Sequence, residues 1–381
     1  MGASNAVLDA SRTGLRLRSI AVIRLSSVGD VIMAMPAVER LREAHPTAHI
    51  AWVVEGRARN ILEGFPAIDE IIEFPRTLIR ELWKKPFGLL RCTAPILAFR
   101  RELRRRRFDL SIDFQGNLKS AACTVMAGAR RRLGYDGTQC REPNHWFTNE
   151  VLRLNGQEMH RMDRDLLLAG LAGARFGFTH PRIHFSAEDR RVGCTVIRNP
   201  GVGPPVVVLH PGTSDFMPHK RWPLERYAAF GDVLSRRAGA RILLSWGPGE
   251  EPMVNEIRKR MQQPSEILPP TPTIKSLGHV LQRADLVVGG DTGPIHLAVA
   301  LGTPTLILLG PGDPRHYYPH GHPERVFYHR VPCSPCRNRS CALLACMSEI
   351  SVDEVAERAL TVLAERSAHS PPEDRSAGAA S

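Results

Sequence analysis

The sequence lacks several features that would place it in a familiar class. No apolar run approaches the roughly 20 residues of a membrane-spanning helix, and the N-terminus has no apolar core of the kind found in secretory signals. The arginine-rich stretches are not interleaved with aromatic residues, and no nucleic-acid-binding module is recognisable. We therefore expect a cytoplasmic protein without a nucleic-acid partner.

Two further absences narrow the class of protein. The glycine fingerprint G-x-G-x-x-G, which announces an NAD or FAD domain, is missing after the first predicted strand. A dehydrogenase is therefore disfavoured. The eight cysteines do not indicate a disulfide framework, because such frameworks belong to short secreted chains and this chain has 381 residues.

The chain is long, apolar and basic. With 381 residues and 43% hydrophobic content, it can fill the cores of two ordinary domains. The formal net charge is +12, and residues 100–107 include a dense arginine run. Such a run predicts an anionic partner, for example an anionic lipid or a phosphorylated glycolipid, unless it is only a solvated helix end.

Alternating strands and helices predict an α/β fold in two halves. The predicted strands are residues 20–25, 50–54, 110–113, 206–210, 242–246, 286–289 and 305–309. A linker rich in glycine and proline, residues 199–205, separates the two series. We predict two Rossmann-like domains with parallel sheets facing across a cleft, and ligands beyond the carboxyl ends of the strands. The predicted boundaries are 19–185 and 186–366, with disordered tails at 1–18 and 367–381.

The loop after the first predicted strand ends at Asp30, directly before a predicted helix at residues 31–43. Asp is a common N-cap, so one interpretation is that Asp30 caps this helix. The other is that it acts as a general base for an attacking hydroxyl. A helix N-terminus stabilises the carboxylate and weakens such a base, whereas burial in a closed cleft has the opposite effect.

Residues 20–31, I-A-V-I-R-L-S-S-V-G-D-V, resemble the opening motif of the ADP-heptose:lipopolysaccharide heptosyltransferases. These are inverting enzymes of glycosyltransferase family 9 with the two-domain GT-B architecture. Residues 112–121 and 132–136 are similar to later motifs of the same family, the second of which is a short strand, and the matches continue in order along nearly the whole chain. In that family, the residue that matches Asp30 is the proposed catalytic base.

The resemblance implies that the N-terminal domain binds the acceptor. The acceptor-binding residues that we predict are Ser27, Gly29, Gln115, Lys119 and Arg132. The basic character of this half suits an anionic acceptor, such as the Kdo- or heptose-bearing inner core of lipopolysaccharide.

Residues 210–214, H-P-G-T-S, form a turn after a predicted strand, and Lys220 follows just before a helix. Spacing alone favours an ordinary surface lysine. The resemblance implies instead that Lys220 holds the donor's phosphates, together with Thr213 and Ser214 in the turn.

Residues 289–296, G-G-D-T-G-P-I-H, carry the strongest local signal. A plain helix start accounts for Thr292 and Pro294 but does not require an Asp or a His there. The segment resembles the D-T-G-x-x-H donor-binding motif of the same family. The donor-binding residues that this implies are Asp291, Thr292, Gly293 and His296.

Four cysteines cluster near the C-terminus in the spacing C-x2-C-x4-C-x4-C. They are Cys333, Cys336, Cys341 and Cys346. A zinc or iron–sulfur site, a reduced structural loop and disulfides formed on isolation all remain open. Many members of the resembled family carry similar segments without a catalytic metal, which favours a structural role.

The resemblance predicts an inverting, metal-independent glycosyltransferase without a cofactor. It would move heptose from ADP-heptose to the lipopolysaccharide inner core, as a peripheral protein on the inner face of the cytoplasmic membrane. Asp30 would be the base, and Lys220 and Thr292 would stabilise the leaving nucleotide. The alternatives are a related transferase with another nucleotide sugar or acceptor, and a non-catalytic sugar-nucleotide binding protein. The oligomeric state stays open.

Overall fold

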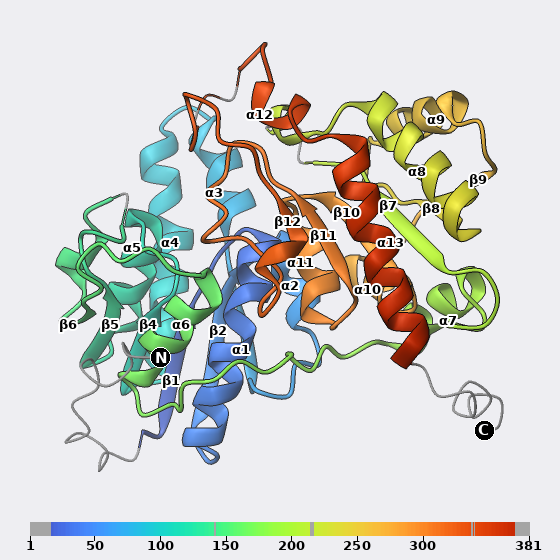
Figure 1. The fold of residues 1–381 in the computed structure, drawn as a ribbon. Helices are drawn as coiled ribbons and strands as arrows, with labels where there is room; N and C mark the ends of the chain where they lie inside the picture. Colours follow the sequence, from blue (N-terminus) through green and yellow to red (C-terminus); the bar gives the residue numbers. More distant parts are fainter. Residues whose placement is uncertain (1–16, 141, 214–216, 337, 339, 370–381) are drawn as a thin grey trace. The chain divides into compact units, whose positions relative to one another are not determined.

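The computed structural model describes residues 17–140, 142–213, 217–336, 338 and 340–369 (Figure 1). The chain divides into two compact units, Met1–His184 and Phe185–Ser381. The predicted tails lie almost entirely outside the described residues. The last helix, α13 (Val352–His369), runs past the predicted domain end at residue 366.

The first unit is built on a six-stranded parallel sheet (Figure 1). Its strands are β1 (Ser19–Ile23), β2 (His49–Glu55), β3 (Glu70–Phe74), β4 (Leu110–Asp113), β5 (Arg131–Tyr135) and β6 (Glu150–Leu152). Its helices are α1 (Val28–Ala44), α2 (Gly56–Leu62), α3 (Arg76–Trp83), α4 (Gly88–Arg105), α5 (Leu118–Ala127), the short η2 (Asn144–Phe147) and α6 (Arg161–Gly170). The strand order across the sheet is β3-β2-β1-β4-β5-β6.

The second unit repeats this plan. Its strands are β7 (Val206–His210), β8 (Arg241–Leu244), β9 (Ser265–Ile267), β10 (Leu286–Gly290), β11 (Thr305–Leu308) and β12 (Val326–Phe327). Its helices are α7 (Ala187–Val196), η3 (Pro218–Lys220), α8 (Leu224–Ala238), α9 (Glu251–Arg260), α10 (Ile274–Gln282), α11 (Gly293–Ala300), η4 (Pro323–Arg325), α12 (Ala345–Ser348) and α13. The order β12-β11-β10-β7-β8-β9 is the same Rossmann arrangement.

The central strands are apolar because helices cover both faces of each sheet. All five residues of β1 are buried, and so are all five of β7. Alternate residues of β7 point to opposite faces: Val207 and Leu209 join one core cluster, while Val206 and Val208 join another. Each fully buried aliphatic side chain of this kind stabilises the fold by about 1.5–3 kcal/mol.

The predicted α/β class with two Rossmann-like sheets is confirmed. In each sheet the strand order reverses between the first and fourth strands, which here are β1 and β4, and β7 and β10. In folds of this type, ligands bind next to such a reversal point, beyond the carboxyl ends of the strands. No helix in the described part of the chain combines the length and apolar character that crossing a bilayer requires.

Candidate functional site

The first helix begins earlier than the sequence predicts. α1 starts at Val28 with Ser27 as its N-cap, so Asp30 is its third residue. Asp30 Oδ2 accepts hydrogen bonds from the Ser27 backbone N–H at 3.1 Å and from the Ser27 hydroxyl at 2.9 Å. The interpretation of Asp30 as the N-cap is therefore wrong. A serine followed three residues later by a carboxylate starts a helix at the serine, as in a capping box.

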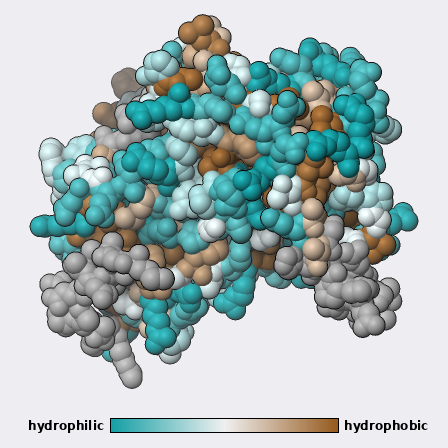
Figure 2. Space-filling model, in the orientation of Figure 1, coloured by the Kyte–Doolittle hydropathy of each residue, from teal (hydrophilic) through white to brown (hydrophobic). Residues whose placement is uncertain are grey.

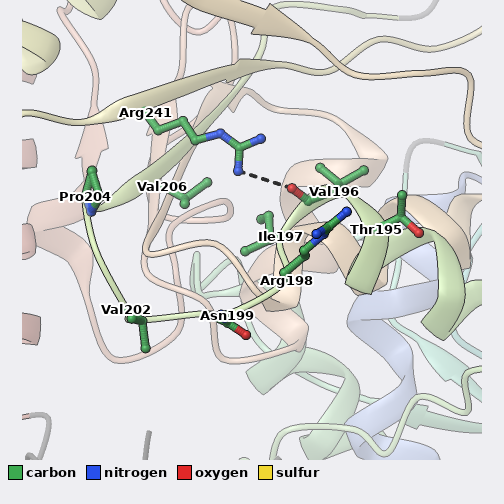
Figure 3. Close-up of a pocket in the computed structure, with 9 residues that line it drawn as sticks. All are labelled: Thr195, Val196, Ile197, Arg198, Asn199, Val202, Pro204, Val206 and Arg241. Atoms are coloured by element: carbon green, nitrogen blue, oxygen red, sulfur yellow. Dashed lines mark hydrogen bonds between the residues drawn. The ribbon is translucent and has the colours of Figure 1, made fainter. Parts of the chain in front are cut away.

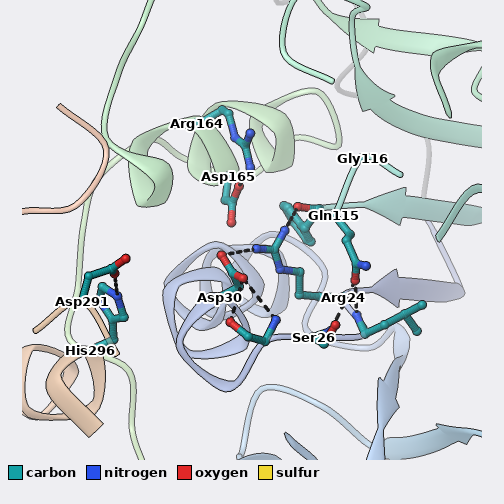
Figure 4. Close-up of polar contacts among 12 residues, drawn as sticks. Arg24, Ser26, Asp30, Gln115, Gly116, Arg164, Asp165, Asp291 and His296 are labelled. Atoms are coloured by element: carbon teal, nitrogen blue, oxygen red, sulfur yellow. Dashed lines mark hydrogen bonds and ion pairs between the residues drawn. The ribbon is translucent and has the colours of Figure 1, made fainter. Parts of the chain in front are cut away.

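The other carboxylate oxygen of Asp30 pairs with Arg24. Arg24 Nη2 lies 2.7 Å from Asp30 Oδ1, and Arg24 Nη1 donates to the carbonyl of Phe114 (Figure 4). Arg24 is 2% exposed, so protein groups rather than water compensate its charge. The Asp30 side chain is 25% exposed, and Oδ1 can accept one more hydrogen bond. The carboxylate is thus fixed in orientation but open to a ligand.

The environment of Asp30 stabilises its ionised form. Burial of the carboxyl favours the neutral acid, but the charges of Arg24 and Arg161 and the two hydrogen bonds from Ser27 outweigh burial. The pKa of Asp30 is therefore held well below its usual range. Asp30 is ionised throughout the physiological pH range, and it is a weak base in the absence of substrate.

A buried network from α6 backs the Arg24–Asp30 pair (Figure 4). Asp165 accepts a hydrogen bond from the Tyr135 hydroxyl, and Arg164 Nη2 lies 3.4 Å from Asp165 Oδ1. The Arg164 guanidinium lies 4.1 Å from the centroid of the Tyr135 ring. Burial raises the pKa of Asp165, against the opposing charges of Arg164 and Arg24. Sequence patterns did not predict this network. Its one local signal is Arg24, a charged residue that directly follows the buried strand β1.

The loops after β1 and β4 are tied together at the reversal point of the first sheet. Gln115 Oε1 accepts hydrogen bonds from the backbone N–H groups of Leu25, at 2.7 Å, and Ser26, at 3.3 Å. The buried Asp113 carboxylate in turn accepts from the backbone N–H groups of Gln115 and Gly116. Gln115, predicted as an acceptor-binding residue, holds the shape of the loop that leads to Asp30.

The other predicted acceptor-binding residues fall in different places. Gly29 is buried in the first turn of α1, and Lys119 forms an ion pair with Glu55 at the carboxyl end of β2. Both therefore lie at the same edge of the sheet as Asp30. Arg132 lies near the start of β5 and donates to the carbonyl of Phe147 at 2.9 Å. The structure does not bring Arg132 to this group.

One pair of carboxylates bears on the prediction that no metal is needed. Asp163-Arg164-Asp165 is an Asp-x-Asp triplet, a spacing that can chelate a divalent ion when it lies in a loop. Here it lies inside α6, and residues two apart on a helix point in different directions. Asp165 is buried and held by Tyr135. The two carboxylates therefore do not form a joint metal site in this conformation.

The second unit places a compact ionic group at the reversal point of its sheet. Asp291 follows β10, and its Oδ2 lies 2.5 Å from Lys220 Nζ. Its Oδ1 lies 2.8 Å from His296 Nε2, one helical turn into α11. The Asp291 and His296 side chains are each 8% exposed and that of Lys220 is 19% exposed. The structure thus unites three predicted donor-binding residues, although Lys220 is distant from the other two in sequence.

Asp291 is ionised in this group. Burial favours its neutral form, but the hydrogen bond and charge of His296, followed by those of Lys220, lower its pKa well below the usual range. Thr292, the N-cap of α11, has a buried hydroxyl without a hydrogen-bond partner in the described structure. Gly293 begins the helix, so its amide is one of the free donors at an N-terminus. An unpaired hydroxyl beside free amides is suited to a phosphate.

The turn after β7 is only partly described. Thr213 is buried, accepts a hydrogen bond from Arg221 Nε at 2.9 Å, and donates to the carbonyl of Met217 at 3.1 Å. Ser214, also predicted to bind the donor, lies outside the described residues. Thr213 therefore has its own structural partners, in contrast to Thr292.

His210, at the end of β7, makes the stability of this unit sensitive to pH. Burial lowers the pKa of His210 from 6.5 to about 4, and its Nδ1 lies 3.0 Å from the Ser245 hydroxyl. Below pH 6.5 the unfolded chain takes up a proton on this histidine that the folded protein does not take up, so stability falls on acidification.

We expect protonation of His210 in the unfolded chain to lower the free energy of unfolding by about 2 kcal/mol between pH 7 and pH 5. Denaturant titrations of wild type and His210→Asn will measure it, because the variant should lose that part of the slope whatever its absolute stability. Equal slopes would contradict the prediction.

The four clustered cysteines are free thiols. Burial raises the pKa of Cys346, and negative charge on Cys333, Cys341 and Cys336 raises it further. Cys346 also packs in a core cluster of the second unit. The packing of Cys346 in this cluster agrees with the predicted structural role, which stays a prediction.

A separate hollow of about 320 Å³ lies in the second unit between the end of α7 and the starts of β7 and β8 (Figure 3). Arg241 crosses it and donates to the carbonyl of Val196. The hollow is at the amino ends of the strands, whereas ligands of Rossmann-type sheets bind at the carboxyl ends. We therefore place the candidate donor site at Asp291 and not in this hollow.

Comparison with known proteins agrees with the fold. Lipopolysaccharide heptosyltransferase 1 of Escherichia coli strain K12 is 30% identical over 299 residues, which cover 77% of this chain and 88% of that protein. The solved structure of E. coli heptosyltransferase WaaC with ADP-2-deoxy-2-fluoro heptose is 26% identical, with a TM-score of 0.66 over 90% of this chain and 99% of that chain. A glycosyl transferase family 9 structure from Veillonella parvula DSM 2008, at 21% identity, shares the fold with a TM-score of 0.72 over 93% and 99%.

The two Rossmann-like units and the similarity to these proteins define a glycosyltransferase of the GT-B type. The family model described as glycosyltransferase family 9 (heptosyltransferase) matches residues 96–346, two thirds of the chain. The protein belongs to this family.

Proposed function

We propose that this protein transfers a heptose from ADP-heptose to a Kdo or heptose residue of the lipopolysaccharide inner core. The observation that carries the proposal is the group at the start of α11, where Thr292 presents an unpaired hydroxyl beside Asp291, Lys220 and His296. A solved relative was crystallised with an ADP-heptose analogue, which supports the choice of donor.

The donor would be held by the second unit. Lys220 supplies a positive charge to the diphosphate, and Thr292 with the first amides of α11 supplies hydrogen-bond donors. Asp291 and His296 are suited to the hydroxyl groups of the sugar. Negative charge grows on the departing phosphate in the transition state, so fixed donors there lower the barrier. Transfer then requires no metal ion.

The acceptor hydroxyl would be activated by Asp30 in the first unit. Its low pKa is compatible with this role, because the hydroxyl becomes acidic only as its oxygen bonds to the anomeric carbon. A weak base can then take the proton late in the step. Attack from the face opposite the leaving group inverts the anomeric configuration. Arg24 and Ser27 keep the carboxylate in a single orientation.

A donor comparison tests the proposed function. Purified protein and a Kdo-bearing lipid acceptor are incubated with ADP-heptose, and in parallel with ADP-glucose, UDP-glucose and GDP-mannose. We expect transfer from ADP-heptose alone, without added metal and in the presence of EDTA, and a product of inverted configuration by NMR. Faster transfer from another nucleotide sugar would move the protein to a different donor within the same family.

The substitution Thr292→Val tests the role of Thr292 in donor binding separately from any role in folding stability. Valine has nearly the same shape, and the hydroxyl that it removes has no partner in the described structure. We expect unchanged or slightly higher stability and a Kd for ADP raised about tenfold or more, since a hydrogen bond to a charged group is lost. Calorimetric titration and thermal unfolding measure the two quantities.

Thr213→Val is the matched control for this prediction. Its hydroxyl bonds both Arg221 and Met217, so the same chemical change should lower stability by about 1–2 kcal/mol. A Thr292→Val protein that is destabilised but binds ADP normally would show that Thr292 has a structural role instead.

A further inference from the structure

The connection between β3 and β4 contains more than the sheet needs. One helix suffices for such a crossover, and α4 supplies it by burying Cys92, Phe99 and Leu103. The other helix, α3, has no buried residue. It packs beside α4, where the Cys92 thiol contacts the carbonyl of Ile79 at 3.4 Å. The two helices form a hairpin whose outer part adds nothing to the core of the unit.

The outer part of this hairpin is apolar. Of the fourteen large apolar side chains that are exposed in the described part of the chain, seven lie between Leu78 and Leu97. We call Trp83, Lys84, Lys85, Phe87, Leu89 and Leu90 the hairpin tip. Its apolar side chains are 61–81% exposed, and apolar groups appear over α3 and α4 at the upper left of Figure 2. A concentration of this kind marks an interaction surface.

Phe87 is the most unusual residue of the tip. Its side chain is 81% exposed, and its backbone is left-handed, with a φ of 58°. Bulky residues rarely adopt this conformation. An Asn or Gly would fit the turn better and would not expose an aromatic ring to water, so neither local conformation nor the core explains a phenylalanine here.

The hairpin is also strongly basic. Residues 76–105 contain nine Lys or Arg residues and only two Glu residues. In the described structure only Arg76 among these nine pairs with a carboxylate. The basic residues of this described segment without such an ion pair are Arg80, Lys84, Lys85, Arg91, Arg100, Arg101, Arg104 and Arg105. Two of them belong to the tip, next to its exposed aromatic rings. The partner of such a surface must accept apolar groups and carry negative charge.

The hairpin rises from the same edge of the sheet as the candidate acceptor site. Arg76, the first residue of α3, pairs with Glu55 at the end of β2, and so does Lys119. The backbone N–H of Glu55 donates to the carbonyl of Leu25, in the loop that leads to Asp30. A surface bound by the hairpin tip would therefore lie on the acceptor side of the first unit.

We propose that the hairpin tip docks on an anionic phospholipid bilayer. Trp83, Phe87, Leu89 and Leu90 enter the interfacial layer, and the surrounding lysines and arginines contact the headgroups. An interfacial aromatic residue with a flanking lysine is a usual membrane anchor. The docking proposal rests on the proposed function in one respect. The proposed function explains why the protein would meet a membrane, because a lipid-linked acceptor would be presented at the membrane surface.

Vesicle binding tests the proposal without donor or acceptor. The full-length protein is sedimented with vesicles of phosphatidylcholine and phosphatidylglycerol (7:3) and with vesicles of phosphatidylcholine alone. We expect binding to the anionic vesicles that weakens with added NaCl. Phe87→Asn with Leu90→Gln should lower the partition coefficient about tenfold or more. Lys84→Gln with Lys85→Gln should lower it by a similar factor.

Matched variants in the second unit control for the chemical change. Leu343→Gln removes an exposed apolar side chain, and Arg258→Gln with Lys259→Gln removes two exposed charges. Both should bind vesicles like wild type.

The docking proposal is overturned if wild type does not bind the anionic vesicles, or if the tip variants bind them as well as wild type does. It is also overturned if ultracentrifugation shows a dimer that the Phe87→Asn, Leu90→Gln protein loses, because the tip would then bind a second copy. Wild-type transfer to a short water-dissolved acceptor tests the proposed function alone, so its absence would count against that function and not against docking. The tip variants should retain this transfer, and its loss in them alone would overturn a role restricted to docking.

Discussion

Replacing Asp30 by Asn should lower kcat by about 10²–10⁴-fold, the range expected when a general base is removed. Asn has the same size and can still accept a hydrogen bond from the Ser27 backbone. It cannot accept a proton from the acceptor hydroxyl. Initial rates of heptose transfer from ADP-heptose, at saturating donor and acceptor, give kcat for wild type and variant.

Asp30→Asn should also destabilise the folded protein, and this effect has to be distinguished from the effect on kcat. Asp30→Asn removes the anion that pairs with Arg24, which is 2% exposed. We expect a loss of about 1–3 kcal/mol in the free energy of unfolding, as for a buried donor group that loses a charged partner. The Kd for ADP should nevertheless stay within about twofold of wild type if the protein is folded, because the proposed donor-binding residues belong to the other unit.

Ser27→Ala is the matched control. It removes one of the hydrogen bonds that lower the pKa of Asp30 but leaves the carboxylate in place. A loss of less than about tenfold in kcat is expected, as for a single hydrogen bond. If the folded Asp30→Asn protein retains a tenth or more of wild-type kcat, Asp30 is not the base.

The pH dependence of wild type should agree with this assignment. Since the neighbouring charges hold the pKa of Asp30 well below its usual range, its protonation does not limit turnover between pH 5 and pH 8. Any acidic limb within that interval must come from another group or from loss of stability, to which His210 contributes in this direction.

The sequence predicts the interior of both sheets but not their edges. The central strands β4 and β7 coincide with their predicted ranges, because strands buried on both faces read as short apolar runs between turns. The strands that the sequence analysis missed are β3, β6, β9 and β12, and all four are edge strands. They are two to five residues long and mostly half-exposed, and three of them contain Glu. Such segments have too few residues for a periodic signal.

In the candidate site, residues that are close in the sequence could be predicted together, whereas residues that only the fold brings together could not. Asp291 and His296 are five residues apart on a loop and the helix that follows, so a sequence motif can relate them. The network of Arg24, Asp165 and Tyr135 joins β1, α6 and β5. Its members have no common spacing in the sequence, and only the folded unit shows that Arg24 is the partner of Asp30.

Lys220→Met should have the second large effect, a loss of about 10²–10³-fold in kcat. Methionine keeps the apolar stem but removes the positive charge that we assign to the diphosphate. Removal of one fixed group that stabilises transition-state charge typically has a cost of this size. The Kd for ADP should rise as well, but by a smaller factor than kcat falls, since the charge on the phosphate is greatest when the sugar departs. Transfer rates and calorimetric titration with ADP measure both.

The ion pair between Lys220 and Asp291 offers another explanation for a loss of kcat in Lys220→Met. A double-mutant cycle can test this explanation. Lys220 lies 2.5 Å from Asp291, so it could act only by holding that carboxylate in position. In that case Lys220→Met would have no further effect in an Asp291→Asn background, because the group that it positions is already gone. If Lys220 acts on the phosphate directly, its removal should still lower kcat by at least tenfold in that background. Lys220→Arg should recover only part of the activity, because its planar guanidinium differs in reach and shape from the ammonium group.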